Sequence, residues 1–181
     1  MNHKELLKLL SENGIRFVVI GGVALRLYNS PRLTHDIDIV GRILDLDKIV
    51  TLMYRNSYYL IRDVKEHTVD VALTKDEAES WVEKSKSGSI SFILLHSVPE
   101  GNTVGMEAVD ASTQVDFLFE PCIPVTKLLE NARKIELQDL SFYVASVEDL
   151  ITLKKHRSDK NQTDEDDIRY LENLINRTGD F

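Results

Sequence analysis

Apolar residues near the start of the chain change from a helical spacing to a strand spacing. The leucines within residues 6–10 recur at intervals of three and four, which predicts an amphipathic N-terminal helix. The β-branched run at 17–20 has no polar alternation and predicts a strand covered on both faces, ending at Gly21-Gly22. Acidic and apolar residues alternate over 36–40, which predicts a second strand with one carboxylate face and one core face.

The rest of the chain also mixes helical and strand patterns. Ser146 and Asp149 have the spacing of a capping box and predict the start of a helix. We expect further helices at 23–28, 45–56 with Asp45 as its cap, 75–86, 125–133, 146–155 and 164–176, strands at 58–62, 90–95, 114–119 and 142–145, and loops at 99–105 and 157–163. The acidic run 164–167 is interpreted as favourable charge at the start of the last helix.

Length and composition indicate an ordinary globular protein. The chain has 181 residues, of which 43% are hydrophobic and 29% charged, so it can bury a core and form one domain. Its 22 Lys and Arg against 30 Asp and Glu give a net charge of −8, which argues against a large nucleic-acid-binding surface. The net charge does not exclude a local basic pocket.

Neither a disulfide nor a membrane segment is expected. Cys122 is the single cysteine, so no internal disulfide forms and the chain is interpreted as intracellular and cytoplasmic. The longest apolar run, 17–25, lies between Arg16 and Arg26 and is far shorter than the ~20 residues that span a bilayer. Residues 1–10 carry charges among their leucines, unlike a signal peptide.

Three aspartates are the candidates for chemistry. Asp36 and Asp38 are two apart on a predicted strand, so their side chains project from the same face, and Asp116 stands in a similar apolar setting. Carboxylates brought together repel one another unless a cation shares them. Hard oxygen ligands suit Mg²⁺ or Mn²⁺ that bridges substrate phosphates, so the pattern predicts a metal site.

The glycine pair predicts a phosphate site next to the metal. Gly21-Gly22 lies between a buried strand and a helix, where the missing Cβ atoms let backbone N–H groups approach an anion closely. Together the two features predict a site where a triphosphate is cradled and its α-phosphorus is attacked in line.

These residues resemble the nucleotidyltransferase superfamily of the DNA polymerase β type, and within it the small bacterial members related to the AbiEii toxins and the minimal nucleotidyltransferases. That pattern is an apolar strand, Gly-Gly or Gly-Ser, an Asp-x-Asp strand and a later lone carboxylate, and Gly21-Gly22, Asp36-x-Asp38 and Asp116 follow it in order. Arg32-x-Thr34-x-Asp36 and the segment 146–154 also resemble these members. The resemblance covers roughly residues 15–174, although 58–105 matches only in general character.

The resemblance implies a nucleotidyltransferase fold, an α/β (α+β) architecture with a small mixed twisted sheet flanked by helices. It implies a core at 1–145 with a helical portion at 146–181 packed on it as one unit. It also implies the roles of the site residues. Asp36 and Asp38 would bind metal, Asp116 would help activate the attacking hydroxyl and complete the metal-binding set, and Gly21, Gly22, Arg32, Thr34 and Lys154 would contact the nucleotide.

The implied reaction is Mg²⁺- or Mn²⁺-dependent transfer of a nucleoside monophosphate from an NTP to an acceptor hydroxyl. The acceptor is a protein, an RNA such as tRNA, or a small molecule, and some such proteins are toxins paired with an antitoxin. One departure concerns the phosphate contacts: many members carry Ser after the first glycine, and here Gly22 offers only its backbone. Neither the base of the NTP nor the oligomeric state follows from the sequence.

Other classes of protein share the Asp-x-Asp motif, and two non-catalytic functions are also compatible with the sequence. The Asp-x-Asp motif also fits haloacid-dehalogenase-like phosphatases, but these need an apolar strand before the first Asp, where this chain has 32–35. Nucleotide-sugar glycosyltransferases place a nucleotide-binding half before the motif, and only 35 residues precede Asp36. A catalytically silent nucleotide-binding or regulatory partner protein, and a domain that merely binds a divalent ion, are the remaining alternatives. Arg26 is either a surface cation or a triphosphate contact. The basic run 154–157 fits the usual placement of cations at a helix C-terminus, and within it only Lys154 resembles a family position that reaches the nucleotide.

Overall fold

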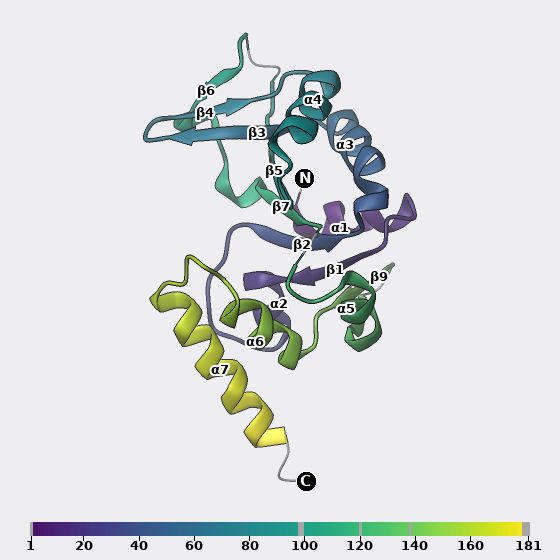
Figure 1. Cartoon of the computed structure of the whole chain (residues 1–181), viewed down its shortest axis with the longest axis vertical. Coiled ribbons are helices and arrows are strands. Elements are labelled where there is room, and N and C mark those ends of the chain that lie inside the picture. Colours follow the sequence, from purple (N-terminus) through teal and green to yellow (C-terminus); the bar gives the residue numbers. More distant parts are fainter. Residues whose placement is uncertain (1, 98–99, 120, 138, 179–181) are drawn as a thin grey trace.

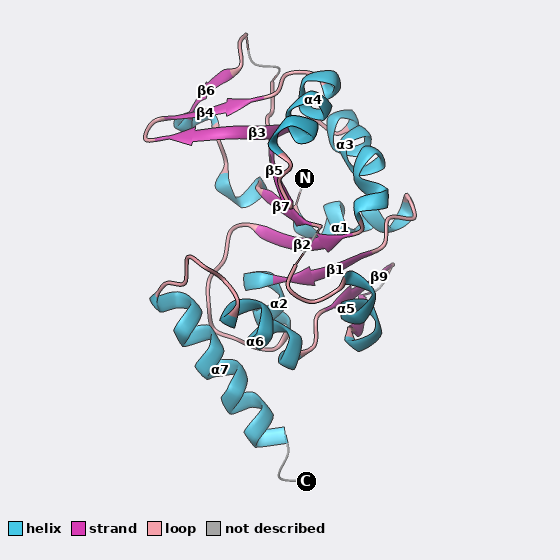
Figure 2. Cartoon of the chain, viewed as in Figure 1, coloured by secondary structure: helices cyan, strands magenta, loops and turns pink. Residues whose placement is uncertain are grey.

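The computed structural model describes residues 2–97, 100–119, 121–137 and 139–178. Within them, nine strands form one mixed sheet in the order β6-β4-β3-β5-β7-β2-β1-β9-β8 (Figure 2). The strands are β1 (Phe17–Ile20), β2 (Ile37–Gly41), β3 (Tyr58–Lys65), β4 (Thr68–Val71), β5 (Ser89–Leu94), β6 (Thr103–Gly105), β7 (Val115–Leu118), β8 (Arg133–Leu137) and β9 (Leu140–Val144).

The centre of the sheet consists of short apolar strands that are covered on both faces. All four residues of β1 are buried, and Ile37 and Ile39 of β2 are fully inaccessible to solvent. Strand β1 runs antiparallel to β2 and parallel to β9, whereas β2 runs parallel to β7. Burial of these apolar side chains is the main stabilising contribution, and it leaves the alternate positions of β2 and β7 free to carry polar groups.

Helices cover the sheet along its length (Figure 1). Helix α2 packs on β1 and β2, α1 on β9, α5 on β1, and α3 on β3 and α4, while α6 packs on α7. Helix α7 lies at the end of the molecule away from β4 and β6 and leads to the C-terminus. The helices are α1 (His3–Glu12), α2 (Gly21–Leu27), α3 (Leu46–Arg55), α4 (Lys75–Ser85), α5 (Val125–Asn131), α6 (Val147–Lys155) and α7 (Gln162–Thr178).

The expected fold class, a mixed sheet flanked by helices, is confirmed. The predicted capping of α6 is also present, because the Ser146 hydroxyl accepts a hydrogen bond from the backbone N–H of Asp149. The division into 1–145 and 146–181 stays a prediction. The C-terminal helices contact the remainder through, among others, the Tyr170 hydroxyl, which donates to the carbonyl of Tyr28.

Several local expectations were wrong. The helix expected at 125–133 ends at Asn131, and Arg133 already begins β8, an edge strand whose exposed charged residues give no apolar alternation. Of the loop expected at 99–105, residues 103–105 form strand β6, and Pro99 lies outside the described residues. Strand β4 at 68–71 had no prediction. Asp45 precedes α3 but makes no cap hydrogen bond, because its carboxylate pairs with Arg42.

The last helix also begins earlier than expected, at Gln162, inside the segment interpreted as a loop. No helix in the described part of the chain combines the length and the apolar character needed to cross a membrane.

Candidate active site

A row of side chains crosses four neighbouring strands at the centre of the sheet. Asp38 of β2 lies directly opposite Asp116 of β7 in the parallel pairing, and Asp116 lies opposite Ser91 of β5. On the other side, Asp38 lies opposite Ile20, the last residue of β1. The strand register therefore brings two aspartates together that are far apart in the sequence.

Asp36 completes a cluster of three carboxylates. It stands one residue before β2, and ligand oxygens of Asp36, Asp38 and Asp116 all lie within 4.8 Å of one another. The Thr34 hydroxyl donates to Asp36 Oδ1 at 2.7 Å, which orients that carboxylate. The Gln114 amide donates to Asp116 Oδ1 and Oδ2 at 3.1 and 3.2 Å, so the side chain before β7 holds the third carboxylate.

Burial and nearby negative charge make Asp38 and Asp116 harder to ionise. Burial raises the pKa of Asp38 to about 6, and the nearby charges of Asp36 and Asp116 add to the effect, while Lys154 and Arg157 oppose it. Burial also raises the pKa of Asp116, partly offset by hydrogen bonds from Ser91 and Gln114. The cluster is an environment in which a cation would relieve an unfavourable interaction.

Both glycines of the pair are needed because other side chains approach their backbone. Gly21 has φ +64°, and a Cβ there would lie 1.8 Å from Asp38 Oδ2. A Cβ on Gly22 would lie 2.4 Å from the Thr34 hydroxyl oxygen. Thr34 thus occupies the space that a serine at position 22 would need, which explains why this chain departs from the Gly-Ser version of the motif.

A cavity of about 530 Å³ opens beside the carboxylates, within the range of ~300–1,000 Å³ found for small-molecule sites. Gly21, Asp38, Asp116 and Lys154 are among the predicted site residues that line it. The remaining lining residues combine apolar side chains with polar groups, namely Ile20, Gly88, Ser89, Ser91, Gln114, Leu118, Pro121, Cys122, Leu150, Leu153, His156 and Arg157.

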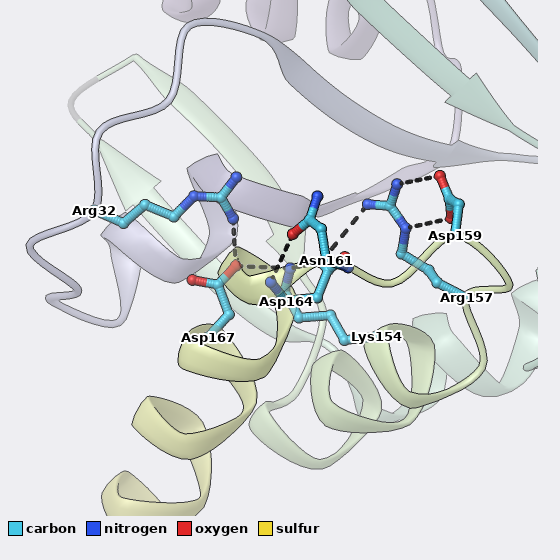
Figure 3. A network of polar contacts seen from close by, with 7 residues as sticks. All are labelled: Arg32, Lys154, Arg157, Asp159, Asn161, Asp164 and Asp167. Atoms are coloured by element: carbon cyan, nitrogen blue, oxygen red, sulfur yellow. Dashed lines mark hydrogen bonds and ion pairs between the residues drawn. The ribbon is translucent and has the colours of Figure 1, made fainter.

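The other predicted site residues do not line the cavity themselves, although Asp36 adjoins it through its cluster with Asp38 and Asp116. Gly22 packs against Thr34, and Thr34 binds Asp36. Arg32 forms an ion pair with Asp167 of α7, and Asp167 also pairs with Lys154 (Figure 3). The structure therefore groups the three aspartates with Gly21 and Lys154 at the cavity and places Arg32 in contact with the last helix.

The sequence analysis missed several residues of this site. Gln114 was assigned only to a strand, and Arg157 only to a basic run, although both line the cavity. The acidic run 164–167 was interpreted as capping, and Asp164 does accept a hydrogen bond from the Asn161 N–H at 3.4 Å. Asp164 and Asp167 are, however, buried and paired with cations, which the capping interpretation did not include.

Residues 6–158 match the model of the protein family described as nucleotidyl transferase AbiEii toxin, type IV toxin–antitoxin system. Among curated proteins, none matches the chain.

Several solved structures are similar to the chain. They include an antigenic nucleotidyltransferase-like protein from Paracoccidioides brasiliensis, with a TM-score of 0.51 and 13% identity over 96% of this chain and 73% of that one. This similarity supports the fold. The lincomycin-bound lincosamide antibiotic adenylyltransferase LnuA has a TM-score of 0.48 and 16% identity over 94% of both chains. The antibiotic-resistance factor ANT(2'')-Ia has a TM-score of 0.49 and 10% identity over 96% of this chain and 87% of its own.

Replacing Asp38 by Asn should stabilise the metal-free protein at neutral pH. Because the folded state raises the pKa of Asp38 from 3.8 to about 6, the unfolded chain loses this proton first as the pH rises. Between pH 4 and 6, the free energy of unfolding of the wild type therefore falls relative to that of Asp38→Asn. Above pH 6, the difference between the two free energies of unfolding stays constant. We expect a gain on the order of 1–3 kcal/mol at pH 7.5, measured by urea unfolding in EDTA.

The control is Asp76→Asn, an exposed position on α4, which should change stability by less than about 0.5 kcal/mol. Equal stability of Asp38→Asn and wild type at every pH would contradict the account of a strained carboxylate cluster.

Replacing Gly21 by Ala should disrupt the carboxylate cluster. The added Cβ meets Asp38 Oδ2, and the left-handed backbone conformation costs a non-glycine residue about 1–2 kcal/mol by itself. We expect Mg²⁺ to raise the melting temperature of the wild type, and we expect Gly21→Ala to melt at a lower temperature and to lose this response, both measured by thermal unfolding. Gly101→Ala is the matched control, since its Cβ would meet no atom within 4 Å. A Gly21→Ala protein with unchanged melting and an unchanged Mg²⁺ response would refute this role.

Proposed function

The chain belongs to the AbiEii nucleotidyl transferase family, and on this premise we propose that it transfers a nucleoside monophosphate from an NTP to an acceptor hydroxyl with a divalent cation, Mg²⁺ or Mn²⁺. The observation that carries this proposal is the convergence of Asp36, Asp38 and Asp116 at the edge of the cavity. Since the family is defined by nucleotidyl transfer, the open questions are the metal, the site residues and the acceptor.

The three carboxylates fit a hard divalent cation. They offer only oxygen ligands, which Mg²⁺ and Mn²⁺ prefer, and their geometry allows one ion to contact all three. Burial, together with the negative charge of the neighbouring carboxylates, raises the pKa values of Asp38 and Asp116, and the nearby cations and hydrogen bonds offset this only in part. When bound, the cation would neutralise charge on the triphosphate and on the attacking oxygen.

The other side of the cavity suits the phosphates. Lys154 and Arg157 line it, and both are close enough to lower the pKa of Asp38. We propose that Lys154 contacts the triphosphate and that the backbone of Gly21 and Gly22 approaches it closely. We propose that Arg32 and Thr34, which do not line the cavity, also support nucleotide binding. Thr34 does so by orienting Asp36.

Asp116 is the candidate base for the acceptor hydroxyl. Its raised pKa makes its carboxylate a better proton acceptor than an ordinary aspartate, while Gln114 holds it in place. In this scheme Asp116 Oδ takes the hydroxyl proton as the acceptor oxygen forms a bond to the α-phosphorus. The bond from the α-phosphorus to the oxygen that bridges to the β-phosphate breaks, and pyrophosphate leaves with that electron pair.

The acceptor is proposed only by class, as a protein, an RNA such as tRNA, or a small molecule. The family description favours a toxin that is paired with an antitoxin. We propose that it acts in the cytoplasm. The net charge of −8 argues against an extended nucleic-acid surface. A catalytically silent regulatory partner is the weaker alternative, because it would have no chemical reason to keep three repelling carboxylates together.

The direct test is calorimetric titration of the protein with each of the four NTPs in the presence of Mg²⁺. We expect the wild type to bind at least one NTP with Mg²⁺ and to bind it much more weakly in EDTA. The double variant Asp36→Asn, Asp38→Asn should lose this metal-dependent binding, because Asn carries no charge to hold the cation.

The matched control is Asp76→Asn, Asp166→Asn, which removes the same formal charge from two exposed positions on α4 and α7. It should bind as the wild type does. If the folded wild type binds none of the NTPs, or if the Asp36→Asn, Asp38→Asn variant binds as tightly as the wild type, the proposed site is wrong.

A further inference from the structure

Two carboxylates of the last helix pair with one lysine that lines the cavity. Lys154 Nζ on α6 lies 2.9 Å from Asp164 Oδ1 and 2.7 Å from Asp167 Oδ2 on α7 (Figure 3). An ammonium group has three N–H donors, and these two contacts use two of them. One donor of a lysine that lines the cavity therefore remains for a bound anion.

These charges are buried, so their positions depend on one another. Lys154 is 6% exposed, Asp164 3% and Asp167 4%. A buried ion pair adds little net stability compared with apolar side chains of the same size, but its groups hold a defined geometry. The network is therefore better explained by the placement of Lys154 than by a contribution to folding.

Asp167 pairs with a second cation, which lies next in sequence to the segment that contacts the carboxylate cluster. Its carboxylate pairs with the guanidinium of Arg32, in the segment that enters β2. Two residues later Thr34 donates to Asp36. One side chain of α7 thus connects the wall of the cavity, through Lys154, with the segment that orients Asp36.

The contacts of Arg157 are different. Its guanidinium binds Asp159 at 3.0 and 3.2 Å and lies 3.7 Å from Asp164, and half of its side chain is exposed. Asp167 is therefore the residue that joins the two predicted nucleotide contacts Arg32 and Lys154. It lies beyond residues 6–158, the part that matches the family model.

We propose that Asp167 is a positioning residue of the nucleotide site, which holds Lys154 at the wall of the cavity and Arg32 beside the segment that orients Asp36. The inference rests on the proposed function, because it assigns Asp167 to the same NTP site. It does not make Asp167 a ligand of the nucleotide: Asp167 acts through Lys154 and Arg32.

The test compares Asp167→Asn with the wild type by calorimetric titration of the four NTPs with Mg²⁺. Positioning and simple electrostatics predict opposite results. Removal of a negative charge near the site should by itself strengthen binding of a triphosphate. Loss of positioning should instead weaken it, and we expect the dissociation constant to rise by about tenfold or more.

Two controls separate positioning from unfolding. An irreversibly misfolded fraction lowers the binding stoichiometry, and reversible unfolding is detected by urea unfolding of the same variant, because it raises the apparent dissociation constant only where the variant is partly unfolded without ligand. A mispositioned Lys154 instead raises the dissociation constant at wild-type stoichiometry in a variant that is folded under the titration conditions. Asp166→Asn is the matched control, since it removes the same charge from the neighbouring position on the exposed face of α7. Its dissociation constant should equal that of the wild type.

A further variant keeps the inference testable if Asp167→Asn does not fold. Asp167→Glu keeps the charge that pairs with Arg32 and Lys154 and moves it by one methylene. It should weaken NTP binding at normal stoichiometry, which a change of charge cannot explain. Unchanged or tighter binding in the folded Asp167 variants would overturn the inference while leaving the proposed function intact. Absence of NTP binding in the wild type would overturn both.

Discussion

The mutual repulsion of Asp36, Asp38 and Asp116 is the constraint on which the rest of the site depends. Strand register brings Asp38 and Asp116 together as direct partners, and the buried residues Ile37 and Ile39 prevent β2 from turning its carboxylate face away. Burial and, after it, the charges of Asp36 and Asp116 raise the pKa of Asp38. The proposed divalent cation would offset this repulsion during nucleotidyl transfer.

The surrounding residues keep these carboxylates in place by close approach and by hydrogen bonds. Gly21 has no Cβ where Asp38 passes, and Gly22 leaves room for Thr34, which holds Asp36. The glycine pair of the family motif is therefore required here by side-chain packing, independently of any phosphate contact. Local sequence, strand pairing and side-chain contacts all favour the same arrangement, which is typical of a functional site.

Much of the site could be predicted from the sequence because its signals are local. The Asp-x-Asp alternation on β2 and the apolar setting of Asp116 identify side chains on one face of a sheet. The edge strand β8 was missed because it has no apolar alternation. Asp167 was missed because a charge near a helix start suggests capping, yet it shares a helix face with the buried Leu171, four residues later. Its partners Arg32 and Lys154 are distant in sequence, so tertiary structure alone reveals the network.

The proposed site requires the three carboxylates to share a divalent cation beside a bound triphosphate. Anomalous diffraction from crystals grown with Mn²⁺ and a non-hydrolysable analogue of the NTP that binds would locate both groups directly. We expect a manganese signal within about 2.0–2.5 Å of oxygens from Asp36 and Asp38, with the triphosphate in the cavity that Lys154 lines. A bound analogue with no manganese at these carboxylates, or with its phosphates outside this cavity, would contradict the proposed site.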